Sequence, residues 1–189
     1  MAGGRGSHFP VQTVDLGPTG SPLTYNEATL PNGGKLGMLM EWSNRVFRLV
    51  KVDVSECGTV DSLDGGVAYW EDRSNWTVNT DASAGEGLAN GVAGGTHVVV
   101  DVSVGTDRYI FVQVGGDQAA VQVAASTAIS DQMSGHASTD NILTRTAAGT
   151  AVINPLVAVA LSARGTTTTD NGVSLANSAK VRWHLGMLM

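Results

Sequence analysis

The side chains that could do chemistry are scattered along the chain and form no known catalytic motif. The four histidines are His8, His97, His136 and His184. Catalytic and metal sites often show short fixed spacings, such as His-Glu-x-x-His, the P-loop or the Gly-x-Ser-x-Gly nucleophile elbow. None of these spacings occurs in the sequence. We therefore interpret the histidines as surface or interface residues, and we predict that the chain is not an enzyme and uses no metal or cofactor.

Acidic residues are the next candidates, because carboxylates can bind a cation. They fall into two groups: Asp61, Asp64, Glu71 and Asp72, and then Asp117, Asp131 and Asp140. Their spacing fits no EF-hand loop. Aspartate is common in turns, where its side chain bonds the nearby backbone, so we interpret these residues as turn residues. The single cysteine, Cys57, cannot form an intrachain disulfide, and we interpret it as a packing residue in a reducing compartment.

The aromatic residues raise a different function, because exposed aromatic rings stack on sugars in carbohydrate-binding β domains. The four tryptophans are Trp42, Trp70, Trp76 and Trp183, and each has apolar neighbours in or beside an expected strand. Large aromatic side chains in such positions usually fill a core. We predict core or intersubunit packing, with a carbohydrate-binding module as the alternative. Exposure of Trp70 or Trp76 beside a polar groove would favour that alternative.

Composition limits the kind of partner. The 189 residues carry a net charge of -6, and no cluster of Lys and Arg occurs along the sequence. Phosphate contacts need a basic surface, so we expect no direct nucleic-acid binding. No apolar run approaches the roughly 20 residues of a spanning helix, and no signal-peptide core follows the first residue, so we expect cytoplasmic synthesis and no membrane association.

The positions of proline divide the chain into two parts. Four of the five prolines, Pro10, Pro18, Pro22 and Pro31, fall within residues 1–34. Proline removes a backbone donor and cannot lie inside a sheet or propagate a helix, so this segment is predicted to be an extended N-terminal arm. Fully extended, its first 31 residues would span roughly 100 Å, at about 3.3 Å per residue. An arm of this length is typical of a protein that belongs to an assembly.

Residues 35–189 read as a compact β body. Period-2 alternation predicts a strand over residues 46–54, with Val46, Arg48, Val50, Val52 and Val54 on one face and Phe47, Leu49, Lys51 and Asp53 on the other. Residues 67–70 and 76–78 form an expected hairpin, and residues 97–104 and 109–114 form a second one. Further strands are expected at 120–123, 142–146, 152–153, 156–161 and 180–185. Turns are expected at 61–66 and 115–117, a loop at 81–95, and one short helical turn within 124–140. We predict an all-β body, either a barrel or a sandwich.

One five-residue motif occurs twice in the sequence. Leu-Gly-Met-Leu-Met occurs at residues 36–40 and again at residues 185–189. We expect the two copies to lie in equivalent environments, as neighbouring strands that either the core or a partner covers. Methionine adapts well to a partner surface, so Met38, Met40, Met187 and Met189 are our candidates for an interface with a partner.

The middle of the chain resembles a known family in the order of its parts. Those parts are Gly-Gly-Val-Ala-Tyr-Trp at 65–70, Trp-Thr-Val at 76–78, small residues at 84–92, and Arg-Tyr-Ile-Phe-Val-Gln-Val-Gly-Gly at 108–116. Residues 147–150 and 157–162 look like the Gly-rich stretch and the small apolar strand that follow in that family. Over residues 55 to 185, the chain resembles the capsid decoration, or head cement, proteins of tailed bacteriophages.

This resemblance implies a structural protein of the virion that binds the outside of an assembled shell and stabilises it. Such proteins are often trimers and contact the major capsid protein. Residues 35–189 would be the decoration domain, and the arm at 1–34 would contact capsid subunits or a neighbouring copy. Its apolar anchors would be Phe9, Val11, Val14, Leu16 and Leu23. The interface of Met38, Met40, Met187 and Met189 would be an oligomer or capsid interface. The alternatives are another virion component, such as a head fibre base or a tail protein, or the carbohydrate-binding module.

Overall fold

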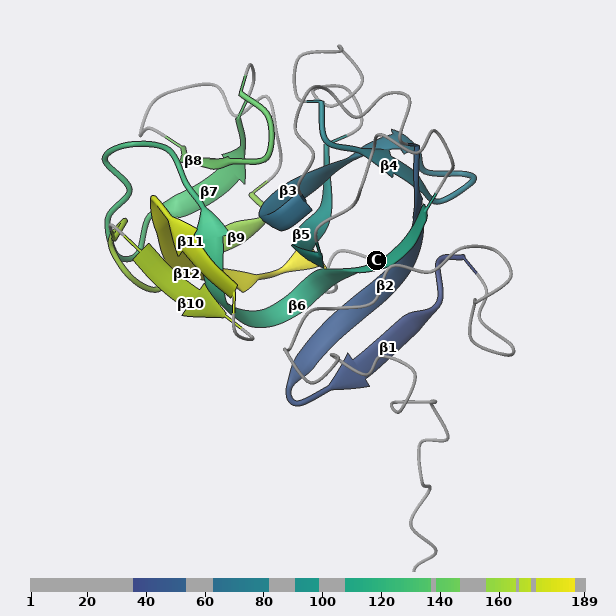
Figure 1. Cartoon of the computed structure of the whole chain (residues 1–189), viewed down its shortest axis with the longest axis horizontal. Helices are drawn as coiled ribbons and strands as arrows, with labels where there is room; N and C mark the ends of the chain where they lie inside the picture. Colours follow the sequence, from purple (N-terminus) through teal and green to yellow (C-terminus); the bar gives the residue numbers. More distant parts are fainter. Residues whose placement is uncertain are drawn as a thin grey trace, which may run out of the picture.

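A computed structural model describes residues 36–53, 63–81, 91–98, 108–136, 139–146, 156–165, 167–170 and 173–185. The body is all-β, as predicted (Figure 1). The predicted arm at 1–34, Cys57 and the strand expected at 152–153 lie outside the described residues. Within the described part of the chain, no helix is long and apolar enough to cross a membrane.

Twelve strands are present in the described residues. They are β1 (Leu39–Trp42), β2 (Arg45–Val52), β3 (Leu63–Asp72), β4 (Thr77–Asn79), β5 (Val92–Val98), β6 (Arg108–Gln122), β7 (Gln132–Gly135), β8 (Leu143–Arg145), β9 (Ala158–Ala160), β10 (Thr167–Asp170), β11 (Val173–Ala176) and β12 (Ser178–Trp183). Ten of them form one sheet in the order β1-β2-β4-β3-β5-β6-β12-β9-β7-β8, while β10 and β11 form a separate hairpin.

Five of the strands close into a ring. An additional pairing joins β2 to β6, so β2, β4, β3, β5 and β6 surround one interior. The ring closes through a short parallel pairing of Lys51 and Val52 with Thr77 and Val78. The predicted hairpin of residues 67–70 and 76–78 is confirmed as the antiparallel pair β3–β4. We call this ring the barrel, and the strands β12, β9, β7 and β8 beyond it the second sheet.

Strand β6 belongs to both parts of the fold (Figure 1). Its first half pairs with β2 and its second half pairs with β12. The turn predicted at residues 115–117 is therefore wrong, because Gly115 and Gly116 lie inside a continuous strand. Gly116 has a φ of 81°, which a residue with a Cβ adopts only with strain, so the strand bends there while it keeps its pairing.

A tight hairpin packs against this bend. Strands β1 and β2 are joined by Ser43 and Asn44, whose φ angles of 50° and 62° fit the type I′ turn of a two-residue loop. A Cβ on Gly116 would overlap the carbonyl oxygen of Asn44, so the turn and β6 approach each other as closely as backbones allow. The glycine thus sets the position of the hairpin tip on the surface of β6.

The apolar residues form three clusters. The first fills the barrel: Val50, Val52, Ala68, Trp70, Val78, Ala93, Ile110, Val112 and Val114. The second lies between the barrel and the second sheet: Val67, Tyr69, Val92, Val121, Val123, Met133, Leu143, Val157, Ala158, Ala160, Ala179, Val181 and Trp183. The third contains Met40, Phe47, Leu49 and Phe111. The predicted faces of β2 are confirmed, since Val50 and Val52 point into the barrel and Phe47 and Leu49 into the third cluster.

Buried polar side chains connect the barrel to the second sheet. Gln118 of β6 accepts a hydrogen bond at 2.8 Å from Trp183 Nε1 of β12. Its amide donates to the carbonyl oxygens of Thr96 at 3.0 Å and Ala120 at 3.3 Å. Both Gln118 and Trp183 press on Gly95, where a Cβ would overlap Gln118 Oε1. The glutamine side chain therefore fits only because the neighbouring position of β5 is glycine.

Glycine explains most of the differences between prediction and structure. The loop predicted at 81–95 is wrong from Val92 onward, because β5 runs straight through Gly94 and Gly95. The turn predicted at 61–66 is wrong from Leu63 onward, because β3 passes through Gly65 and Gly66 with a register shift between Asp64 and Val67. Glycine often signals a turn, but here it permits a bulge or a close approach within a strand.

The prediction of a short helical turn within residues 124–140 is wrong for another reason. The described part of residues 124–140 contains β7 (Gln132–Gly135) and turns instead. Residues 133–135 of β7 are buried, and β7 pairs with β8 along these residues and with β9 at Gln132 and Met133. Met133 is the single large apolar residue of this strand, so the sequence shows no alternation that indicates a strand. The hairpin β10–β11 was not predicted for the same reason, because β10 consists of three threonines and an aspartate.

We expect the Gln118→Ala variant to be strongly destabilised. The change leaves the Trp183 Nε1 donor and the Thr96 carbonyl without their partner in the core and opens a cavity. The free energy of unfolding should fall by about 2 to 4 kcal/mol, measured by urea denaturation. Gln132→Ala is the matched control, because Gln132 is exposed on β7, and its effect should be about 0.5 kcal/mol or less. Equal losses for the two variants would contradict this account of the network.

Candidate functional site

The candidate site is a groove where the hairpin tip meets β6 and β12. It has a volume of about 550 Å³ and is lined by Ser43, Asn44, Arg45, Gly116, Asp117, Ala119, Lys180 and Arg182. The three segments come from distant parts of the sequence, and β6 brings them together. The groove therefore exists only in the folded chain.

Small residues of β6 and long cationic side chains shape the groove. Gly116 and Ala119 supply the least side-chain volume along this part of β6. On β12, burial alternates, so Val181 points inward while Lys180 and Arg182 point outward on one face. Arg45, the first residue of β2, lines the groove from the hairpin side. The small residues thus lie between positively charged side chains that come from two different strands.

An aspartate holds two of these cations in place. Arg182 Nε donates to Asp117 Oδ1 at 2.6 Å, and a second guanidinium nitrogen donates to Oδ2 at 3.2 Å. Lys180 Nζ lies 3.3 Å from the same Oδ2. Hydrogen bonding from Arg182 is the main cause that lowers the pKa of Asp117 below its usual value, and Asp117 in turn raises the pKa of Arg182. Asp117 and Arg182 are therefore both charged at neutral pH.

The groove is more positive than the rest of the chain. It contains three cationic side chains and one carboxylate, whereas the whole chain has 11 basic and 17 acidic residues. Side chains of Lys180 and Arg182 are 47% and 53% exposed, so both can reach a ligand. The chemistry this arrangement supports is the binding of carboxylate or phosphate groups through charge-assisted hydrogen bonds. The sequence analysis missed it, because Arg45 and the two β12 cations are far apart in the chain.

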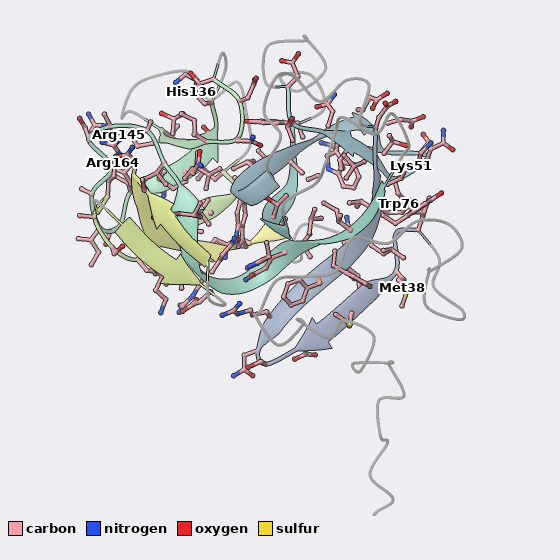
Figure 2. All side chains as sticks on the ribbon, in the orientation of Figure 1. Met38, Lys51, Trp76, His136, Arg145 and Arg164 are labelled. Carbon is pink, nitrogen blue, oxygen red and sulfur yellow. The ribbon has the colours of Figure 1, made fainter. Side chains whose placement is uncertain are left out.

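Of the predicted interface residues, the structure describes Met38 and Met40, and neither lines the groove. Met40 is 2% exposed and belongs to the third apolar cluster, while Met38 packs against that cluster and is half-buried (Figure 2). The other two methionines of the repeat, Met187 and Met189, lie outside the described residues, as do the arm anchors Phe9, Val11, Val14, Leu16 and Leu23. The interface role of all these residues stays a prediction.

The two copies of the repeated motif have different surroundings at their first residues, Leu36 and Leu185. Leu36 packs against the third cluster, whereas Leu185 packs against the first and the second. Leu39 and Met40 pair with β2. The remainder of the second copy, residues 186–189, lies outside the described residues. The expected pairing of the two copies as neighbouring strands stays a prediction.

The histidines do not meet in one site among the described residues. His97 is buried, and its Nε2 donates to Gln113 Oε1 at 2.8 Å, so the predicted surface or interface role of His97 is wrong. His136 Nδ1 accepts a hydrogen bond from the Thr139 backbone at 3.0 Å. His184 is partly buried, and His8 lies outside the described residues. Within the described ranges, no group of three His, Cys, Asp or Glu residues could hold a metal ion.

The turn role predicted for the aspartates is confirmed at two positions. Asp72 Oδ1 accepts hydrogen bonds from the backbone of Ser74 at 2.7 Å and of Asn75 at 3.2 Å. Asp131 Oδ2 accepts one from the backbone of Ala128 at 2.8 Å. Asp117 has a different environment, because its carboxylate faces Lys180 and Arg182 across the strands. Of these three aspartates, only Asp117 lines the groove.

Core packing of tryptophan is confirmed for Trp70 and Trp183, which are 6% and 1% exposed. Trp76 is partly buried, and its ring lies edge-on to Trp70 with centroids 5.9 Å apart. The Arg48 guanidinium carbon lies 5.1 Å from the centroid of the Trp76 ring, which is a cation–π contact. Burial lowers the pKa of Arg48. None of these three tryptophans lines the groove.

Comparisons with known proteins found no relative. The sequence matches no family model, and neither a curated protein nor a solved structure matches the chain. The groove is therefore interpreted from its own side chains, and its charge is the feature that suggests a ligand.

We expect the ion pairs of Asp117 to contribute to stability at neutral pH and not in acid. The folded-state pKa is lowered, so the contribution is present above the unfolded pKa of about 3.9 and is lost as the pH falls through the lowered value. Asp117→Asn should cost at most about 1 kcal/mol at pH 7, because the pairs are solvent-exposed. Urea denaturation at a series of pH values would measure the difference.

The difference between the wild type and Asp117→Asn should shrink as the pH falls from about 4 toward 2. Glu41→Gln is the control, since it removes one exposed carboxylate from β1. A difference for Asp117→Asn that stays constant across this range would contradict the assigned role of the carboxylate.

Proposed function

We propose that this chain is a structural virion protein that binds the outer surface of a bacteriophage capsid and stabilises the shell, without catalysing a reaction. The observation that carries the proposal is the order of the sequence motifs at 65–70, 76–78 and 108–116, which resembles that of capsid decoration proteins. In the fold these motifs lie in or beside β3, β4 and β6, three strands of one barrel. A compact β body is what the resemblance implies.

The use of the polar residues supports a structural role. Gln113, Gln118 and His97 are buried, and His97 bonds directly to the Gln113 side chain. The Gln113 amide donates to the carbonyl oxygen of Gly115, and the Gln118 amide donates to that of Thr96. The Tyr69 hydroxyl is likewise directed to the carbonyl oxygen of Ile142 at 3.3 Å, and burial raises its pKa. His97 and Tyr69 carry groups that could act as an acid or a base in an enzyme, and here their hydrogen bonds connect segments of the core.

In this proposal the arm at 1–34 makes the main contact with the major capsid protein. An extended segment can pair its backbone with an exposed strand, and many copies on one shell add their weak contacts through avidity. The body would be a homo-oligomer, with a trimer favoured, on the exterior of a virion assembled in the host cytoplasm. The net charge of -6 suits the outer surface better than a surface facing DNA.

The alternatives differ in what they require. A carbohydrate-binding module would be favoured by an exposed Trp70 or Trp76 beside a polar groove. Trp70 is buried, and Trp76 is partly buried and does not line the groove. A head fibre base or tail protein needs no feature that distinguishes it from a decoration protein in the fold. The capsid-binding function is therefore the version to test first.

The test is co-sedimentation of the purified chain with undecorated shells of the phage presumed to encode it. We expect the full chain to sediment with shells at a fixed stoichiometry. Removal of residues 1–31 should abolish sedimentation, because the proposed anchors are lost. The circular dichroism and the unfolding midpoint of the truncated chain serve as the control for folding.

Three outcomes would each contradict a part of the proposal. A full chain that ignores shells would overturn the capsid function itself. A truncated chain that is folded and still binds shells would overturn the role of the arm, and an unfolded truncation would contradict the division into arm and independent body.

A further inference from the structure

We propose that the free edge of β1 is a contact between two copies of this chain, in which β1 of one copy pairs with β1 of the other as antiparallel strands. Strand β1 (Leu39–Trp42) lies at one end of the ten-stranded sheet, beyond β2 (Figure 1). The contact joins the sheets of the two copies edge to edge. It goes beyond the proposed function and does not depend on it.

The pairing with β2 fixes which backbone groups of β1 point outward. The Leu49 amide donates to the Met38 carbonyl oxygen at 3.0 Å, so this pair is hydrogen-bonded. Bonded and non-bonded pairs alternate along an antiparallel ladder, so the next residue of β1 that bonds to β2 is Met40. The N–H and C=O groups of Leu39 and Glu41 therefore point away from β2.

These outward groups are open to another strand. Among the described residues, β1 pairs with β2 alone, and no backbone hydrogen bond reaches the outward groups of Leu39 and Glu41. The opposite end of the sheet differs, because Leu143 of β8 accepts a hydrogen bond from the Ala124 amide at 2.8 Å and bridges to Val123. An edge with unpaired backbone groups is a template for a further strand. The β1 edge is thus the place where this sheet can be extended.

The side chains of β1 favour burial by an added strand. Leu39 is 40% exposed, although most large apolar side chains of the described residues are buried. Met40 points to the opposite face, where it is 2% exposed and belongs to the third apolar cluster. A strand beside β1 covers Leu39 on one face and extends the third cluster on the other.

Charge and backbone shape select one register. Bonded pairs must join outward residues, which leaves two-fold axes centred on Leu39, Met40 or Glu41. An axis at Glu41 places two carboxylates directly opposite each other, which is unfavourable. An axis at Leu39 places Glu41 against Gly37, whose φ of 81° makes a bulge in the strand. An axis at Met40 pairs Leu39 with Glu41 in both directions and uses every outward group.

The same register identifies a second copy as the occupant. A two-fold axis at Met40 maps the edge onto itself, so each outward donor meets an outward acceptor of the other copy. Each Glu41 carboxylate then faces an apolar Leu39, and the two carboxylates lie on a diagonal. Such a contact uses the same surface on both copies and closes after two of them. It therefore covers both edges and leaves no open strand.

The contact is weak by itself. A strand pair of this length buries much less than the roughly 1,200 to 2,000 Å² of a stable interface. We expect a dissociation constant of about 0.1 mM. Each copy carries a net charge of -6, and the contact contains no ion pair, so the copies repel each other at low salt. Added salt should therefore strengthen the association.

Disulfide cross-linking of the full-length chain tests the register. Leu39→Cys and Glu41→Cys are made separately in a Cys57→Ser background and are oxidised with glutathione disulfide, alone and as a mixture. Facing residues have Cα atoms about 5.5 Å apart, which a disulfide spans, whereas identical residues lie on a diagonal of more than about 7 Å. The mixture should form at least about fivefold more cross-linked dimer than either variant alone. Equal yields in the three samples, or no dimer in the mixture, would overturn the register.

A pair of charge variants tests the same contact without cysteine. Leu39→Glu and Leu39→Lys lose the same apolar side chain, but only the lysine faces Glu41 of the other copy with the opposite charge. We expect L39E to dimerise about tenfold more weakly than L39K in sedimentation equilibrium between about 0.02 and 2 mM protein. Gln132→Glu and Gln132→Lys are the matched controls on exposed Gln132, and they should differ by about twofold or less. Equal dissociation constants for L39E and L39K would contradict the pairing, and so would a wild type that is monomeric at about 1 mM.

A backbone variant tests the hydrogen bonds. Glu41→Pro removes an N–H that β2 does not use, and proline is tolerated where an edge N–H faces solvent. Glu41→Gln is the matched control, because it keeps the N–H and removes the charge. E41P should dimerise about tenfold more weakly than E41Q, and thermal unfolding of both checks the fold. If E41P is folded and dimerises as tightly as E41Q, the pairing is overturned.

Co-sedimentation with shells separates this inference from the proposed function. If L39E does not pair but still sediments with shells, the edge contact and the capsid function are both supported. If the wild type pairs through β1 and ignores shells, the edge contact holds and the capsid function fails. If L39E and E41P lose shell binding while the wild type alone stays monomeric, the edge takes a strand of the shell, and the assignment to a second copy is overturned.

Discussion

The structure depends on one strand that is shared between two parts of the fold. Strand β6 closes the barrel through its pairing with β2 and then begins the second sheet through its pairing with β12. A continuous backbone can serve both only if it bends without losing its ladder. Gly115 and Gly116 supply that bend, because a positive φ at Gly116 carries no Cβ penalty. Every other element takes its place relative to this strand.

The polar core makes the junction specific. Apolar packing alone would let two sheets slide along each other, since hydrophobic contact has no direction. The bonds of Gln118 to Trp183, Thr96 and Ala120 have fixed lengths and angles, so only one arrangement satisfies them. A buried polar group without a hydrogen-bond partner costs more free energy than a satisfied hydrogen bond contributes. Packings that leave these groups without partners are therefore unfavourable. Gly95 completes the arrangement by leaving room for both side chains.

The groove follows from the same constraint. The bend of β6 and the absence of a side chain at Gly116 allow the hairpin tip of β1 and β2 to approach the strand. That approach places Arg45 opposite the outward face of β12, which carries Lys180 and Arg182 because the other face must bury Val181 and Trp183. The bend of β6, which joins the barrel to the second sheet, thus also creates the charged groove.

The sequence by itself determined the all-β class, the alternating faces of β2, the β3–β4 hairpin and the burial of Trp70, because these depend on neighbours two residues apart or on side-chain type. It could not distinguish a glycine in a turn from a glycine inside a bent strand, since both need the same backbone freedom, and it misplaced parts of β3, β5 and β6 for that reason. It also showed no basic cluster. Only the tertiary structure decided that Arg45, Lys180 and Arg182 meet, because their proximity comes from the pairing of β6 with β2 and with β12, and strand pairing between distant segments leaves no local pattern.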